Sequence, residues 1–221
     1  MLFLFLLGEL ILHPYVEQTA GPLYYLFRSL TIGVTLASVY AVSFRRGLIF
    51  IALLLALPVI VERSVFLRSE LGAMAMFISI ANFTFDLFVV VVIFRRVFAR
   101  ENPTGETIFG AVCIYLLLGF TFARLYAVVA AVQPHAFYLD PTTNSRSVPT
   151  SFDFVTFSFG SMTTAGAAGI TAVSPGARSV SMLESILGVL YLAVMISRLI
   201  DAYRPSYSGS GNGSDQDGPE D

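Results

Sequence analysis

Charged residues are scarce in this chain of 221 amino acids. Only 13% of its residues are Asp, Glu, Lys or Arg, whereas a soluble domain carries roughly 25%. Lysine is missing altogether, so all 13 strongly basic residues are arginines. Hydrophobic residues make up 56% of the chain, and its mean hydropathy is +0.76. This composition excludes an ordinary soluble domain and predicts a protein embedded in a lipid bilayer.

Cysteine and histidine are also rare. Cys113 is the single cysteine, which excludes an intrachain disulfide. The two histidines, His13 and His135, are far apart in the sequence, which argues against a zinc site. A net charge of -2 argues against nucleic acid as a partner. Because no nucleophile–base pair, metal cluster or phosphate-binding loop stands out, neither an enzymatic activity nor a cofactor is expected.

Long apolar segments are plentiful. A membrane-spanning helix needs about 20 largely apolar residues. The windows that meet this requirement are residues 23–44, 48–67, 71–94, 107–133 and 179–200. Residues 1–13 fit a short first span, a truncated span or the core of a signal peptide, although they lack the basic start of a signal peptide. The short first span is favoured, and it brings the total to six.

The arginines between these windows predict the orientation. With six spans, all the clusters in the connecting segments fall on one side of the membrane, namely Arg45 and Arg46, then Arg95, Arg96 and Arg100, then Arg198 and Arg204. The positive-inside rule makes that side cytoplasmic. We therefore expect a multi-pass protein of the plasma membrane with a cytoplasmic C-terminus. The tail, residues 205–221, is acidic and rich in Gly and Ser, which predicts disorder.

The long connection before the last window departs from this pattern. Residues 134–149 are full of turn formers, but residues 150–164, TSFDFVTFSFGSMTT, are too apolar for a solvated loop and too short to span. Thr150 and Asp153 fit a helix start, because a hydroxyl can cap free amides while a carboxylate faces the positive helix end. A half-length helix that enters and leaves on one side needs protein or water around it. The sequence thus predicts a re-entrant helix.

Small residues follow this helix in the stretch TTAGAAGIT, residues 163–171. One interpretation is close packing between membrane helices, which small residues allow. The other is a selectivity filter, or a segment derived from one. The residues that come next, including the run S-P-G-A-R at 174–178, favour the second interpretation.

The pattern T-T-x-G-x-x-x-I-T-x-x-S-P-x-A-R resembles the pore module of bacterial potassium channels, whose filter reads T-V-G-Y-G-D, and it aligns without a gap. The resemblance implies a homotetramer, a permeant monovalent cation (K⁺ or Na⁺), and support of the pore by Asp153, Phe157 and Phe159. It also implies a filter made of Thr163, Thr164, Ala165, Gly166, Ala167, Ala168 and Gly169.

Four filter positions depart from the family pattern. Valine is replaced by Ala165, tyrosine by Ala167, the second glycine by Ala168 and the acidic residue by Gly169. An alanine in a left-handed conformation costs about 1–2 kcal/mol, and the missing ring is expected to have braced the filter against the pore-helix aromatics. These departures predict weak selectivity, or a non-conducting assembly or regulatory subunit. Restoring all four family residues together is expected to restore selectivity for K⁺.

Three ionisable residues lie at membrane depth, where they are costly and often functional: Asp86, Arg124 and Glu184. One hypothesis pairs Arg124 with Glu184 as further support of the pore. The alternative has Arg124 extending outward while Glu184 binds nearby backbone. No partner is evident for Asp86 at its depth. Since no span carries arginine at every third position, a voltage sensor is not expected.

The predicted fold is therefore an all-α membrane protein with about six transmembrane helices, and a re-entrant pore helix and filter loop between the last two. Residues 1–100 would form an N-terminal membrane region of about four helices, residues 101–204 the pore domain, and residues 205–221 the tail. The expected partners are the lipid bilayer and further copies of the chain.

Overall fold

The computed structural model describes residues 2–16, 21–42, 46–64, 72–99, 105–167 and 169–203. Within these ranges the chain is mostly helical, as predicted, with seven helices and two short strands. The helices are α1 (Leu2–Val16), α2 (Pro22–Val42), α3 (Arg46–Ser64), α4 (Gly72–Phe98), α5 (Gly105–Val132), α6 (Ser151–Met162) and α7 (Pro175–Tyr203). The strands are β1 (Phe137–Leu139) and β2 (Ile170–Ala172).

Four helices are long and apolar enough to cross a membrane: α2 over Tyr24–Val42, α4 over Met76–Phe98, α5 over Ile108–Val132 and α7 over Pro175–Ile200. Each falls on one of the predicted windows. The apolar parts of α1 and α3 are shorter, Leu2–Tyr15 and Gly47–Ile60. Residues 65–67, the end of the predicted window 48–67, lie outside the described residues, as does the predicted tail.

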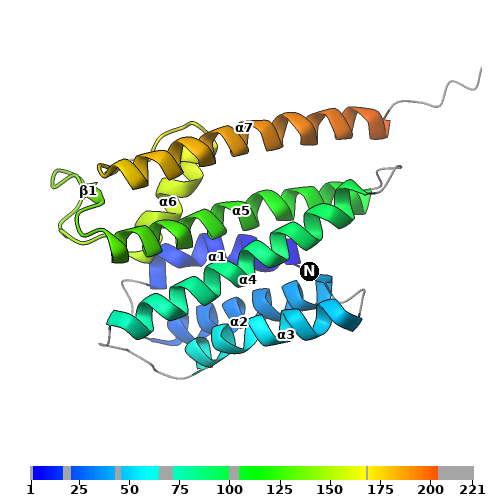
Figure 1. Cartoon of the computed structure of the whole chain (residues 1–221), viewed down its shortest axis with the longest axis horizontal. Coiled ribbons are helices and arrows are strands. Elements are labelled where there is room, and N and C mark those ends of the chain that lie inside the picture. The colour runs from blue at the N-terminus through cyan, green and yellow to red at the C-terminus, as the bar shows by residue number, and fades with distance from the viewer. Residues whose placement is uncertain are drawn as a thin grey trace, which may run out of the picture.

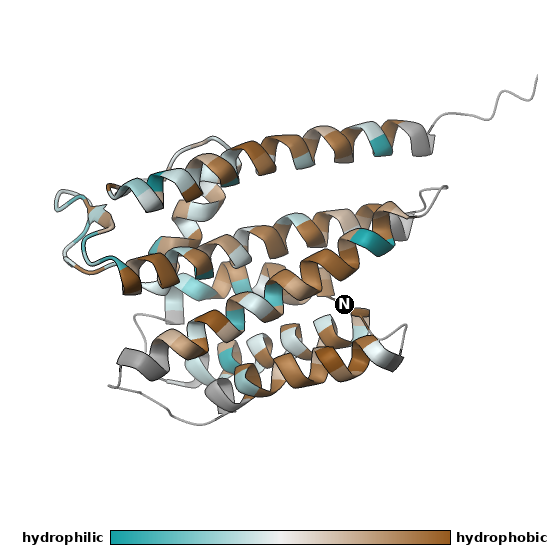
Figure 2. Cartoon of the chain, viewed as in Figure 1, coloured by the Kyte–Doolittle hydropathy of each residue, from teal (hydrophilic) through white to brown (hydrophobic). Residues whose placement is uncertain are grey.

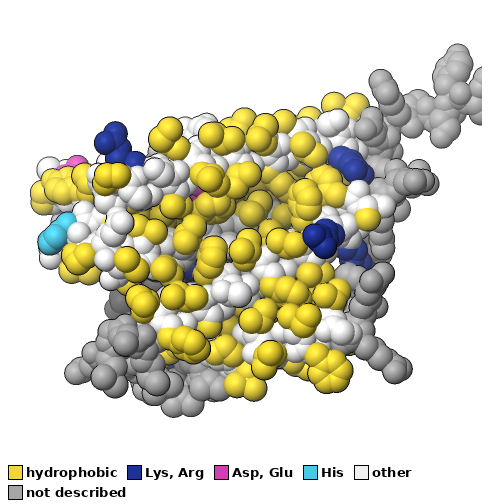
Figure 3. All heavy atoms as spheres, in the orientation of Figure 1, with side chains coloured by type: hydrophobic (Ala, Val, Ile, Leu, Met, Phe, Trp, Pro, Cys, Tyr) yellow, Lys and Arg dark blue, Asp and Glu magenta, His cyan; other side chains and the backbone are white. Residues whose placement is uncertain are grey.

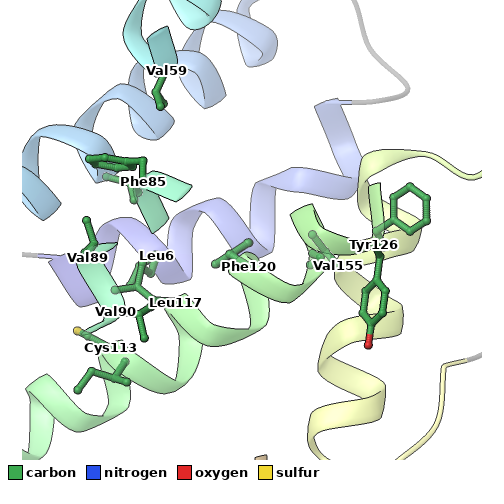
Figure 4. Close-up of a cluster of buried hydrophobic side chains, with 14 of the residues drawn as sticks. Leu6, Val59, Phe85, Val89, Val90, Cys113, Leu117, Phe120, Tyr126 and Val155 are labelled. Carbon is green, nitrogen blue, oxygen red and sulfur yellow. The ribbon is translucent and has the colours of Figure 1, made fainter. Parts of the chain in front are cut away.

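The helices pack into one bundle, in which α4 runs along α5 and α1 lies against both α2 and α5 (Figure 1). Leu6 of α1, Val89 of α4 and Leu117 of α5 point toward one another in the buried core (Figure 4). The last two long helices, α5 and α7, hold the short helix α6 between them. It lies at the end of the bundle that carries β1 (Figure 1). The N-terminal helices thus pack directly on the first helix of the predicted pore domain.

The outer surface of the bundle is apolar along the helices. Hydrophobic residues predominate along the helices, and many of the more hydrophilic ones lie in the loops around β1 (Figure 2). Hydrophobic side chains cover most of the face seen in Figure 3. Phe50 of α3 and Met182 of α7 are 76% and 67% exposed in the single chain. Apolar surface of this extent suits contact with lipid or with other subunits.

Candidate functional site

The short helix α6 begins at the predicted residue. The side chain of Thr150 accepts a hydrogen bond from the Asp153 amide at 3.4 Å, and the Asp153 carboxylate accepts one from the Thr150 amide at 2.7 Å. This reciprocal pair is a capping box. Arg146 lies 3.5 Å from the other carboxylate oxygen of Asp153. The preceding loop is therefore tied to the first turn of α6, as the spacing of Thr150 and Asp153 predicts.

Replacing Thr150 with alanine is expected to lower the free energy of unfolding by about 0.5–2 kcal/mol, because the Asp153 amide loses its acceptor at the start of α6. Thermal unfolding followed by circular dichroism in detergent measures this change. Ser147→Ala is the matched control, since Ser147 is an exposed residue of the same loop. Equal unfolding temperatures for the two variants would contradict the prediction.

Glycines in the neighbouring helices bring α6 close to both. A Cβ atom on Gly119 of α5 would lie 2.5 Å from the Phe159 ring. A Cβ on Gly188 of α7 would lie 2.5 Å from both Cγ and the carbonyl oxygen of Met162, the last residue of α6. Small residues allow this close approach between membrane helices. The spacing of α5, α6 and α7 therefore depends on positions that carry no side chain.

The aromatic rings of α6 pack against neighbouring elements. Phe157 packs edge-on against Tyr126 of α5 and Phe137 of β1, with ring centroids 4.9 and 5.5 Å away. Phe159 packs edge-on against Phe120 of α5 at 5.7 Å. These contacts hold α6 to α5 and β1. Support of the filter by Phe157 and Phe159 stays a prediction, because Ala167 stands where the family has the bracing ring.

The first helix of the chain also reaches α6. His13 Nε2 of α1 lies 3.2 Å from the hydroxyl of Ser151, the first residue of α6. The His13 ring lies 5.7 Å from the ring of Phe152 and 5.2 Å from that of Phe27 in α2. The N-terminal bundle and the start of α6 are thus in direct contact, which the sequence did not indicate.

The predicted filter segment is a loop that folds back on α6. Thr163, Thr164, Ala165 and Gly166 are exposed in the single chain. The Gly166 amide donates to the Gly160 carbonyl at 3.1 Å. Because the small residues at 163–167 and 169 lie outside any helix, the alternative interpretation, in which they form a helix-packing face, is wrong.

Gly160 is the residue that allows the loop to lie so close. A Cβ atom at this position would be 2.7 Å from the Gly166 oxygen, 2.8 Å from its carbonyl carbon and 2.9 Å from the Ala167 nitrogen. All three neighbours are backbone atoms, so no side-chain rotation can relieve the contact. Backbone therefore packs on backbone where α6 meets the loop.

The sign of the backbone φ angle alternates along the loop. Thr164 and Gly166 have φ angles of 59° and 79°, whereas Ala165 and Ala167 lie outside the left-handed region. Successive carbonyl groups can face one side only when neighbouring residues differ in this way. Thr164 is β-branched, and a positive φ is a rare, strained conformation for such a residue. The surrounding contacts, including the bond from the Thr164 amide to the Ser161 carbonyl at 3.2 Å, hold it there.

A set of hydrogen bonds, here called the clamp, holds the C-terminal end of the loop. Strand β2 pairs antiparallel with β1, so that Ile170 lies opposite Leu139. The Gly169 carbonyl accepts bonds from the Asp140 amide and from Asn144 Nδ2, both at 2.9 Å. Loop residues 140–144 therefore hold the backbone where it leaves the predicted filter.

This clamp bears on the predicted substitution of Gly169. Its φ is 84°, and an added Cβ would lie 2.6 Å from Thr143 Oγ1 and 2.7 Å from Asn144 Nδ2. An aspartate at this position would be strained and would have to displace the side chains of Thr143 and Asn144. The restoration of selectivity by the four substitutions together stays a prediction. Ala168 lies outside the described residues.

Acidification is expected to weaken this clamp. The Thr142 amide and hydroxyl donate to Asp140 Oδ1 at 2.9 and 2.8 Å, and these bonds hold the pKa of Asp140 below its usual value. The stabilisation is present above the unfolded pKa of about 3.9 and is lost as the pH falls through the lower folded pKa. The unfolding temperature of the wild type should therefore fall toward that of Asp140→Asn in strong acid. A gap that stays constant down to that range would contradict this.

The ionisable residues at membrane depth pair differently from either hypothesis. Arg124 Nη1 lies 2.9 Å from Asp86 Oδ2, which joins α5 to α4. Glu184 instead contacts the Tyr126 hydroxyl through Oε2 and the Ser158 hydroxyl through Oε1. The proposed Arg124–Glu184 pair is therefore wrong, as is the expectation that Asp86 has no partner. Arg124 faces α4 because α4 packs along α5 on that side.

Sequence reasoning missed the residues that set the loop's geometry: Gly119, Gly160, Gly188, Ser158 and Asn144. A glycine inside an apolar helix lowers the stability of the helix, so its presence suggests a need for close packing. The three glycines therefore carried a signal in the sequence. Ser158 and Asn144 carried none, because their partners come from distant parts of the chain. The chain matches no protein-family model, no curated protein and no solved structure. Its function is therefore inferred from its own geometry.

Proposed function

We propose that the chain is the subunit of a homotetrameric ion channel of the plasma membrane, similar in architecture to bacterial potassium channels. It would pass K⁺ or Na⁺ passively and with weak selectivity. In this proposal α5 and α7 are the outer and inner helices of the pore, α6 is the re-entrant pore helix, and residues 163–169 line the ion pathway. The shorter helices α1 and α3 complete a set of six spans.

The backbone of residues 164–167 carries the proposal. When left-handed and right-handed backbone conformations alternate along a segment, its carbonyl oxygens can form a row that replaces the water shell of an ion. A strained residue such as Thr164, with φ of 59°, persists only when its surroundings enforce it, and such residues cluster at functional sites. The four residues from Thr163 to Gly166 are also exposed in the single chain, where they are accessible to ions.

The assembly follows from the exposure of α7. Within residues 175–200 of this helix, only a narrow stripe is buried, at Ala177, Glu184, Gly188 and Tyr191. Large apolar residues on both flanks of the stripe, such as Met182 and Leu190, are more than half exposed. One loop cannot enclose a pore, so a closed ring of copies is required, and rings of identical subunits have cyclic symmetry.

The orientation follows from the arginines. Arg96 donates to the Ala41 carbonyl at 3.1 Å and Arg198 to the Phe98 carbonyl at 3.0 Å, so both side chains lie at the end of the bundle opposite β1 (Figure 1). Basic residues gather on the cytoplasmic side. The C-terminus would therefore be cytoplasmic, and the loops around β1 would lie outside.

One observation favours a second function, a non-conducting subunit that assembles with or regulates other channels. The Gly169 carbonyl is occupied by Asp140 and Asn144, so this oxygen cannot also face an ion. A pathway with one ring of oxygens fewer would bind ions more weakly. This subunit would keep the fold and the tetramer while the pathway stays closed.

Flux from liposomes separates the two functions. Purified protein is reconstituted, and the release of K⁺, Na⁺ and choline is compared with that of empty vesicles, while native mass measurement gives the number of subunits. A channel passes K⁺ and Na⁺ at similar rates and excludes choline. A tetramer without flux at any voltage or pH supports the non-conducting subunit, and a stable monomer contradicts both.

A further inference from the structure

A carboxylic acid lies at the junction of the three pore-domain helices. Glu184 of α7 is fully buried. Its Oε2 contacts the Tyr126 hydroxyl of α5, and its Oε1 lies 2.5 Å from the Ser158 hydroxyl of α6. The Ser158 oxygen also lies 2.7 Å from the Gly119 carbonyl of α5. The contacts form a chain from Tyr126 through Glu184 and Ser158 to Gly119.

Counting hydrogen atoms along this chain determines the state of Glu184. Two oxygens about 2.5–3.0 Å apart are joined by a hydrogen, so three contacts need three hydrogens. Tyr126 and Ser158 supply one each, and a carbonyl supplies none. An ionised carboxylate only accepts, whereas a protonated one adds the missing donor. With Glu184 protonated, Tyr126 donates to Oε2, Oε1–H donates to Ser158, and Ser158 donates to Gly119.

We infer that Glu184 is a proton-binding site. The folded protein holds it as a neutral carboxylic acid that joins α5, α6 and α7 and positions the pore helix behind the filter loop. If Glu184 lost this proton, its Oε1 and the Gly119 carbonyl would both have to accept the single hydrogen of Ser158. A negative charge would also be buried at membrane depth. The inference does not depend on ion conduction, because it concerns the packing of the three helices.

The surroundings of the carboxyl group favour the neutral form. Tyr126 and Ser158 contact the carboxyl group directly, Tyr115 of α5 lies near it, and Ser161 and Ser181 contact the Tyr126 hydroxyl. None of these is a cation that would stabilise a carboxylate. A buried charge without a counter-charge is costly, and a buried acid avoids the cost by keeping its proton.

Infrared spectroscopy of the purified protein tests the inference directly. The wild type at neutral pH should show the carbonyl band of a protonated carboxylic acid that Glu184→Gln lacks. Glu184→Gln should otherwise behave as wild type, because its amide nitrogen donates to Ser158 and its amide oxygen accepts from Tyr126. Glu184→Ala removes both partners, so its unfolding temperature should fall by about 4 °C or more.

The pH dependence of unfolding gives a second readout. Because the folded state holds one proton that the unfolded state releases at neutral pH, wild-type stability should fall as the pH rises, and Glu184→Gln should not share this fall. Identical infrared spectra for wild type and Glu184→Gln would overturn the inference. So would a Glu184→Gln variant as unstable as Glu184→Ala, or one that fails to fold. Neither readout needs ion flux, so a silent channel leaves the test intact.

Discussion

In the proposed channel, Gly160→Ala is expected to reduce K⁺ flux from liposomes about tenfold or more without preventing assembly of the proposed tetramer. The added Cβ would lie 2.7–2.9 Å from three backbone atoms of Gly166 and Ala167. Overpacking of this kind costs about 1–3 kcal/mol, and every 1.4 kcal/mol is about a tenfold change in population. The loop would have to move away from α6, and residues 164–167 would then lose their alternating backbone conformation.

Gly47→Ala is the matched control, because a Cβ on Gly47 of α3 meets no atom within 4 Å. It should keep full flux. A second readout does not depend on conduction. The Gly166 amide donates to the Gly160 carbonyl at 3.1 Å, so its hydrogen exchange should accelerate in Gly160→Ala alone. Wild-type flux together with wild-type protection in Gly160→Ala would contradict the loop geometry described above.

Breaking the ion pair between α4 and α5 should have the largest effect on stability. Arg124 and Asp86 are 2.9 Å apart, with side chains 23% and 9% exposed. Asp86→Asn leaves the guanidinium without its counter-charge, which costs about 3–5 kcal/mol for a buried pair. For a chain of this size the unfolding temperature should fall by about 6–20 °C.

The double variant Asp86→Asn with Arg124→Gln tests the cause. Removing both charges together should recover most of the lost stability, because a neutral pair carries no uncompensated charge. Arg95→Gln is the control, since Arg95 lies on the exposed surface of the same helix α4. If the double variant is less stable than Asp86→Asn alone, the two side chains do not act as a pair.

Local signals in the sequence predicted the local features of the site. Thr150 and Asp153 are three residues apart and form the predicted capping box, because capping is decided within one helical turn. Four of the predicted spans are confirmed as helices of sufficient length, since hydropathy alone decides them. The alternation in the sign of φ at Thr164 and Gly166 was not predicted, because no local signal places a β-branched residue at a positive φ.

The partners of the buried ionisable groups could not be predicted in the same way. Depth along a helix can be counted from the sequence, but the direction in which a side chain points depends on which helix packs alongside. Arg124 and Glu184 are predicted to share a depth, yet Arg124 of α5 faces Asp86 of α4, whereas Glu184 of α7 faces Tyr126 and Ser158. The Gly169 clamp was missed for a similar reason, because Asn144 is 25 residues away in the sequence.

The contact between His13 and Ser151 also has a consequence for biogenesis. These residues are separated by 138 positions, so α1 is synthesised long before its partner on α6. The Ser151 hydroxyl can reach His13 only after most of the chain has been synthesised. The contact between α1 and α6 is therefore expected to form late, after the N-terminal helices have packed together.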